Sequence, residues 1–99
     1  MSDTKIKAPG SHYKPVFEAI RAELDAETGH RPGRTIEAWI LAERECVLRE
    51  VNRQRRLLAY EPVGIAAVER AERQAVGHSD YISKYAHTAA DLVFRKETA

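Results

Sequence analysis

The chain has 99 residues, which is the length of one ordinary domain. Sixteen basic and fifteen acidic residues leave a net charge of +1, a balance that argues against both a polybasic, histone-like protein and an acidic tail protein. Charged residues make up 31% of the chain and hydrophobic residues 43%, which excludes a disordered or collagen-like chain and favours a globular one.

The sequence carries no signal for a membrane or a secretory route. No run approaches the roughly 18 apolar residues of a membrane-spanning helix, and the first residues lack the apolar core of a signal peptide. The single Cys46 excludes an intramolecular disulfide and favours a reducing compartment. We therefore expect a cytoplasmic protein that makes no contact with a membrane.

The apolar residues are small. Fifteen of them are alanine, so the larger side chains that supply most of the burial energy are few. A domain of this length buries only roughly two-thirds of the surface that its unfolded chain exposes. This thin core favours an oligomer or a bound partner.

The first expected element is a helix that follows a polar arm. Residues 1–11 are polar and broken by Pro9-Gly10, and we expect them to form a flexible N-terminal arm. A helix is expected to begin at Pro15, since proline suits the first helical position, and to end near Gly29, where glycine supplies a C-terminal cap. Its apolar stripe has the 3.6-residue period of a helix and consists of Tyr13, Phe17, Ile20 and Leu24.

A second, long helix is expected over about residues 35–59, with Thr35 as its N-cap. Leu41 and Leu48 are seven residues apart and point roughly 100° away from its main apolar stripe. They need a second neighbour, which is either another helix of the chain or another subunit. The main stripe consists of Ile36, Trp39, Ile40, Val47, Val51 and Leu58, with Cys46 and Leu57 at its margin.

Two shorter helices are expected to follow. Gly64 is a modest N-cap for a helix over about residues 65–76, and Gly77 closes it. Ser79 is expected to cap a fourth helix with Asp80 in its first turn. The apolar stripe of this last helix consists of Ile82, Tyr85, Ala86, Ala89 and Val93.

These elements define the expected fold. No segment shows the period of two that is typical of a strand, so the class is all-α. We expect one helical domain over residues 12–96, a small bundle of three to four helices. The long helix at about 35–59 is central, and a C-terminal helical hairpin occupies about 65–95.

The sequence shows no constellation typical of an enzyme. His78-Ser79-Asp80 contains the residue types of a hydrolase triad, but adjacent residues at a helix start diverge and cannot converge on one substrate. No glycine-rich phosphate loop, Cys-x-x-Cys or His-Glu-x-x-His motif is present. Cys46, at the margin of an apolar stripe, is interpreted as a small buried hydrophobe. We expect no catalytic residue, cofactor or metal.

One pair of residues nevertheless suggests a metal site. His87 and Asp91 are four residues apart on one helical face, which is a spacing that metal ligands use. A third ligand would come from Glu69, Glu72 or His78, provided that the third helix packs beside the fourth in register. A metal-dependent helical domain is therefore the second alternative function.

The sharper signal is a cluster of arginines in the long helix, Arg44, Arg49, Arg53, Arg55 and Arg56. Arg49, Arg53 and Arg56 share one helical face, and the planar donor fork of arginine suits phosphate. Cations are also favoured near the C-terminus of any helix, and a net charge of +1 gives little long-range attraction. A nucleic-acid-binding regulator that uses these three arginines is therefore the first alternative.

The leading expectation is a non-enzymatic protein–protein interaction module, namely a small helical adaptor, inhibitor or regulator that associates with itself as a homodimer or with a protein partner. It rests on the thin core, on the lack of a catalytic constellation, and on the second face of the long helix. The expected partner-binding residues are Leu41 and Leu48.

Overall fold

The computed structural model describes residues 12–29 and 32–95. They form four helices, α1 (Tyr13–Thr28), α2 (Ile36–Leu57), α3 (Ile65–Ala75) and α4 (Tyr81–Phe94), and these described residues contain no strand. The expected all-α bundle is confirmed with four helices, and α2 is the longest at 22 residues. The expected arm at residues 1–11 and the last expected domain residue, 96, lie outside the described residues.

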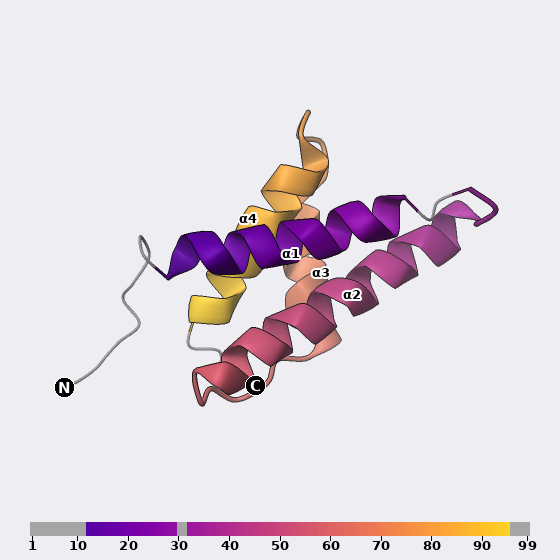
Figure 1. Cartoon of the computed structure of the whole chain (residues 1–99). Helices are drawn as coiled ribbons and strands as arrows, with labels where there is room; N and C mark the ends of the chain where they lie inside the picture. Colours follow the sequence, from indigo (N-terminus) through magenta and orange to yellow (C-terminus); the bar gives the residue numbers. More distant parts are fainter. Residues whose placement is uncertain (1–11, 30–31, 96–99) are drawn as a thin grey trace.

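The helices form two hairpins that cross each other (Figure 1). α1 and α2 pack as one hairpin and α3 and α4 as the other, and α4 crosses α1 steeply. α2 also contacts α3 and α4. The molecule is elongated, with extents of 50 × 26 × 21 Å, because the end of the first hairpin extends well past α3 and α4. That end holds the last turns of α1 and the first turns of α2.

The core lies where the hairpins cross. Tyr85 of α4 is fully buried at its centre and is its largest side chain. Small side chains surround it on α4, so the neighbouring helices approach closely, and the Thr88 hydroxyl donates to the Ala71 carbonyl of α3 at 3.0 Å. The larger buried aliphatic residues are Val16, Ile20, Leu24, Val47, Val51, Val63, Val68, Leu92 and Val93.

The starts of α2 and α4 are held by side-chain caps. Thr35 accepts a hydrogen bond from the Ala38 amide at 3.1 Å, which confirms the expected N-cap of α2. At α4 the expectation was wrong by one residue. Asp80, and not Ser79, is the N-cap, and its carboxylate accepts from the Ser83 amide at 3.2 Å. An aspartate at this position also complements the positive end of the helix dipole.

Two other helix ends differ from the expectation. α1 begins at Tyr13, two residues earlier than expected, because Pro15 then stands in the first turn, where its missing amide donor costs no intrahelical bond. Gly29 has a φ of −66° and ends α1 without the left-handed cap that a glycine there suggests. Gly77, by contrast, has a φ of 93° and makes the left-handed turn after α3.

α2 ends at Leu57, two residues before the expected position, in a hydrogen-bonded C-terminal motif. The Tyr60 amide donates to the Arg55 carbonyl at 2.8 Å, and the Ala59 amide donates to the Arg56 carbonyl at 3.0 Å. This pair of bonds is the Schellman motif. It requires a left-handed residue, and Ala59 takes that conformation with a φ of 62°.

Candidate functional site

The two leucines expected to bind a partner lie in different surroundings. Leu41 is 52% exposed, whereas Leu48 is partly buried and packs against the core. The difference arises because α3 lies beside α2 from about Arg44 onward, where the Arg44 Nε lies 2.8 Å from Glu72 Oε1 of α3. Only Leu41 is therefore presented as a contact residue.

Leu41 belongs to a group that we call the apolar end of α2, formed by Ile36, Trp39, Ile40 and Leu41. At 100° per residue Ile36, Trp39 and Ile40 lie within about 100° of one another on the main apolar stripe, and Leu41 points about 100° away from Ile40. Glu37 is the only charged residue between Ile36 and Leu41. The apolar stripe of a helix is normally buried against a neighbouring element. Here Ile36 is 70% exposed, and Trp39 and Ile40 are only partly covered.

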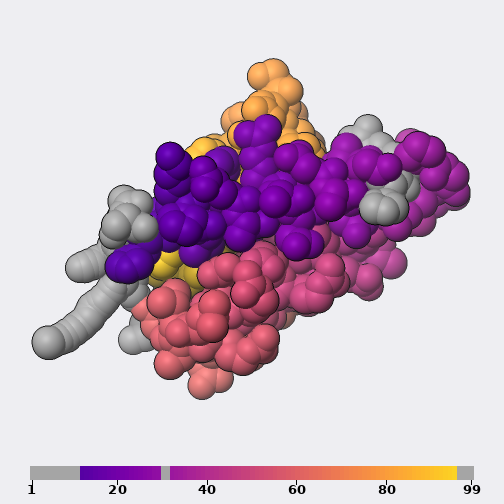
Figure 2. Space-filling view, viewed as in Figure 1, coloured from indigo at the N-terminus to yellow at the C-terminus, as the bar shows by residue number. Residues whose placement is uncertain are grey.

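The position of this segment explains its exposure. It lies in the part of the first hairpin that extends past α3 and α4 (Figure 1), and Figure 2 shows the same end projecting from the molecule. α1 therefore covers one side of the segment, while the second hairpin lies too far along α2 to cover the others. The apolar end of α2 is the main exposed apolar feature of this helix, apart from Leu57 and Leu58 at its opposite end.

The arginine cluster does not form one surface. Arg44 joins α2 to α3, since its Nε lies 2.8 Å from Glu72 Oε1 and its Nη1 lies 3.4 Å from Glu69 Oε2. The hydrogen bond to Glu72 raises the pKa of Arg44. This arginine therefore serves the packing of the two hairpins.

Arg55 is buried and caps a different helix. Its Nη1 donates to the carbonyl oxygens of Leu92, Val93 and Arg95 at 3.0, 3.1 and 2.7 Å, and its Nε donates to the Glu61 carbonyl at 2.6 Å. The carbonyls at the end of α4 have no partner within the helix and carry its negative dipole end. Arg55 satisfies them from outside, so it is unavailable to a ligand.

The three arginines of the nucleic-acid alternative are all exposed, but one of them is paired. Arg53 holds Glu50 with two hydrogen bonds of 3.1 and 2.7 Å. Burial raises the pKa of Glu50, but the hydrogen bonds from Arg53 and Gln54 outweigh it, so the pKa is lowered and the carboxylate stays charged. Arg49 and Arg56 form no hydrogen bond or ion pair with the described residues.

The residues of the metal alternative are held apart. His87 faces α1, where the Tyr13 hydroxyl lies 2.8 Å from its Nδ1 and the Phe17 ring stacks on it at 4.2 Å. Glu72 faces α2 and is bonded to Arg44. Within residues 12–29 and 32–95, no three histidine, cysteine, aspartate or glutamate side chains form a group that could hold a metal ion.

Cys46 is buried against α1, and its Sγ lies 4.0 Å from Glu23 Oε1. Burial and the Glu23 charge raise the pKa of Cys46 to about 12. Because the thiolate is the nucleophilic form, this thiol is unreactive at neutral pH. The interpretation of Cys46 as a buried hydrophobe agrees with this geometry.

The structure also contains a buried polar cluster that was not expected. Glu43 is fully buried, and its Oε1 accepts a hydrogen bond of 3.4 Å from the Tyr81 hydroxyl. The neighbouring Tyr85 hydroxyl is buried, and burial and nearby carboxylates raise the pKa of both tyrosines. The signal was present in the sequence, since Glu43 stands seven residues after Ile36 and four before Val47, on the main apolar stripe of α2.

No protein-family model matches the chain, and the curated proteins and the solved structures compared with it gave no significant match. None of the helices in the described part of the chain is long and apolar enough to cross a membrane.

Proposed function

We propose that this chain is a non-enzymatic protein–protein interaction module that associates with a second copy of itself through the exposed face of α2 that carries Leu41. The observation that supports it is that Leu41, a large apolar side chain in the middle of this face, is 52% exposed. Covering Leu41 would remove its apolar surface from water at about 25 cal/mol per Å².

A second copy suits this surface on grounds of charge. A net charge of +1 produces almost no repulsion between two molecules of the chain. The outer face of α2 carries an exposed row at intervals of four residues, formed by Glu37, Leu41, Glu45 and Arg49. The row contains both signs of charge, as a self-complementary surface requires.

This row has a natural antiparallel pairing. A two-fold axis midway between Leu41 and Glu45 places Glu37 of each copy opposite Arg49 of the other, and Leu41 opposite the stem of Glu45. Rows at four-residue spacing are the ridges by which helices most often pack. The pairing therefore gives two ion pairs around a central apolar contact.

A binding role without catalysis is supported by the charged and nucleophilic side chains, which have structural tasks. Arg44 and Arg55 hold the hairpins together, Asp80 caps α4, and the pKa of Cys46 is raised. A cytoplasmic location is part of the proposal, since an unpaired cysteine persists in a reducing compartment.

The test is the solution mass of Leu41→Glu, measured by light scattering coupled to size exclusion over a range of concentrations. Leu41 is exposed, so the variant should fold normally and elute as a monomer while the wild type is a dimer. Leu57→Glu is the matched control, because it makes the same change at a 70% exposed leucine at the other end of α2. A wild-type monomer, or equal weakening by both variants, would rule out the proposed interface.

A second candidate, a nucleic-acid-binding regulator, is favoured by the exposure of Arg49 and Arg56. Phosphate contacts by these guanidinium groups would make the affinity fall steeply between about 50 and about 200 mM salt. Fluorescence anisotropy of a labelled duplex would measure this, and Arg49→Ala with Arg56→Ala should weaken binding to all sequences alike. Absence of saturable binding at low salt would eliminate this candidate.

A further inference from the structure

The connection from α2 to α3, residues 57–66, is exposed and almost entirely apolar, and we call it the apolar corner. Eight of these ten residues are exposed, and only Glu61 among the eight carries a charge. Three large apolar side chains have exposed fractions of 70%, 39% and 40%, those of Leu57, Leu58 and Ile65. Exposed apolar groups that gather in one place mark a surface that binds a protein or a membrane.

Hydrogen bonds hold the apolar corner in this shape. The Asn52 side chain bonds both backbone groups of Val63, since its Oδ1 accepts from the amide at 2.8 Å and its Nδ2 donates to the carbonyl at 3.0 Å. Arg55 donates to the Glu61 carbonyl at 2.6 Å, and the Schellman motif fixes the residues that follow Leu57. Because the backbone is fixed at these places, the leucines stay at the surface.

Arginines stand on the α2 side of the apolar corner. Residues 53–66 contain three arginines and a single acidic residue. Arg56 is exposed beside Leu57 and forms no hydrogen bond or ion pair with the described residues. Arg53, one turn earlier, bonds Glu50 through Nε and Nη2, and its side chain is still 52% exposed. The surface therefore presents positive charge next to its apolar side chains.

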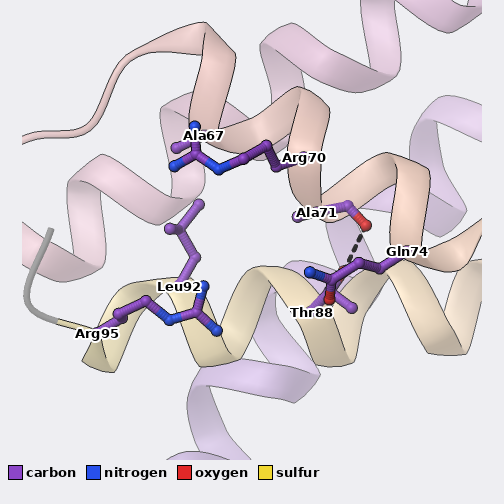
Figure 3. A pocket seen from close by; sticks show the side chains of 7 residues that line it. All are labelled: Ala67, Arg70, Ala71, Gln74, Thr88, Leu92 and Arg95. Carbon is purple, nitrogen blue, oxygen red and sulfur yellow. Dashed lines mark hydrogen bonds between the residues drawn. The ribbon is translucent and has the colours of Figure 1, made fainter. Parts of the chain in front are cut away.

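The shape of this region favours a membrane over a protein as the partner. The end of α2 and the segment that follows it form a convex lobe at the lower edge of the molecule (Figure 2). The pocket between α3 and α4 (Figure 3) has room for about one water molecule, and none of its lining residues belongs to the apolar corner. A protein partner would need a hollow of matching shape, whereas lipids rearrange around a convex apolar surface.

We propose that the apolar corner binds the surface of an anionic membrane, with Leu57 and Leu58 at the boundary of head groups and acyl chains and with Arg53 and Arg56 at the lipid phosphates. The expectation of no membrane contact considered spanning segments and signal peptides, and binding to the surface of a membrane needs neither. The site is independent of the self-association proposed above, because that pairing uses side chains of residues 37–49.

The test is co-sedimentation of the whole chain with sucrose-loaded vesicles of phosphatidylcholine, either alone or mixed with phosphatidylserine. We expect binding to the anionic vesicles that weakens as salt is added, and much weaker binding to the neutral ones. Leu57→Glu should lower the partition coefficient on anionic vesicles about tenfold or more, because it removes apolar contact and adds a charge of the same sign as the lipid. Arg56→Gln should lower it about fivefold.

Val76→Glu is the matched control, because it makes the same kind of change at a 63% exposed apolar residue beyond the opposite end of α3. It should fold, as circular dichroism checks, and bind anionic vesicles as the wild type does. Each variant keeps Leu41 and should self-associate normally in light scattering, so a loss of vesicle binding is distinct from a loss of self-association.

Three results would overturn the proposal. The first is absence of binding to either kind of vesicle, which leaves a protein surface as the occupant of the apolar corner. The second is equal binding to neutral and anionic vesicles, which removes the role of the arginines. The third is equal weakening of binding by Leu57→Glu and Val76→Glu, which removes the role of the apolar corner.

Discussion

Among the residues that the structure describes, Ala59 is the one non-glycine residue with a left-handed backbone. Its φ of 62° lies in the left-handed region, which costs a residue with a Cβ roughly 1–2 kcal/mol and costs glycine far less. The strain persists because other contacts fix the turn. These are the two hydrogen bonds of the Schellman motif and the stacking of the Arg55 guanidinium on the Tyr60 ring, with Cζ 5.3 Å from the ring centroid.

Replacing Ala59 by glycine should therefore stabilise the protein by about 1 kcal/mol, which raises Tm by roughly 4–8 °C in a domain of this size. Thermal unfolding followed by circular dichroism measures the change. Ala22→Gly is the control, because Ala22 is exposed inside α1, and the same substitution there should destabilise by about 1 kcal/mol. A loss of stability in Ala59→Gly similar to that of the control would contradict the role assigned to this turn.

The arginines of α2 show that residues clustered in the sequence can have separate roles. Arg44 pairs with glutamates of α3, Arg53 pairs with Glu50, and Arg55 is buried under the end of α4. Only Arg49 and Arg56 are exposed without an ion pair to the described residues. The positive face inferred from helical spacing is therefore smaller than the sequence suggested.

At the scale of the elements, α4 depends on a residue outside it for its C-terminal cap. The carbonyl oxygens of Leu92, Val93 and Arg95 accept hydrogen bonds from Arg55. The same guanidinium bonds the Glu61 carbonyl, so it joins the end of α4 to the segment between α2 and α3.

Arg55→Lys should destabilise the protein by about 3 kcal/mol or more, because a compact ammonium group cannot span these carbonyls and leaves buried acceptors without donors. Urea unfolding gives the free energy of unfolding directly. Arg56→Lys, at the exposed neighbouring position, should stay within about 0.5 kcal/mol of the wild type. Equal stability of the two variants would mean that Arg55 is not the cap of α4.

Local signals were sufficient to predict the elements and the fold class. The 3.6-residue periodicity located all four helices, and Thr35 and Gly77 marked ends that the structure confirms. These features depend on neighbours in the sequence, so the sequence alone contains them.

Features that depend on how the hairpins cross could not be predicted in this way. Leu41 and Leu48 occupy equivalent places on the helical face, yet only Leu48 packs on the core, because α3 runs beside α2 from about Arg44 onward. The capping role of Arg55 likewise needs the end of α4 to be placed over α2. Leu41 therefore stays a candidate contact residue because it is exposed, and Leu48 lies at the margin of the core.

For the molecule as a whole, the stability of the fold at high pH depends on thiol and phenol groups whose burial favours the neutral form. Burial raises the pKa of Cys46 and of Tyr13 to about 12, and it raises the pKa values of Tyr81 and Tyr85 as well. The folded protein therefore keeps protons that the unfolded chain releases above about pH 9 to 10. The stability from these groups is complete below that range and is lost as the pH rises through the folded pKa values.

Between pH 7 and 8 these thiol and phenol groups should leave the free energy of unfolding almost unchanged. By pH 11 their ionisation should lower it by about 2 kcal/mol or more. Urea unfolding midpoints at each pH measure this, and Cys46→Ala should show a shallower fall. A midpoint at pH 11 equal to that at pH 7 would contradict the burial of these groups.

The central claim is that the outer face of α2 pairs with itself in antiparallel fashion, and a charge-exchange experiment tests it most directly. Glu37→Arg and Arg49→Glu each place like charges opposite each other in the proposed dimer, and each should raise the dimer dissociation constant about tenfold. The double variant restores opposite charges and should return the constant to near the wild-type value. Analytical ultracentrifugation measures the three dissociation constants. The account is contradicted if the dissociation constant of the double variant is as high as the added free-energy effects of the two single variants predict.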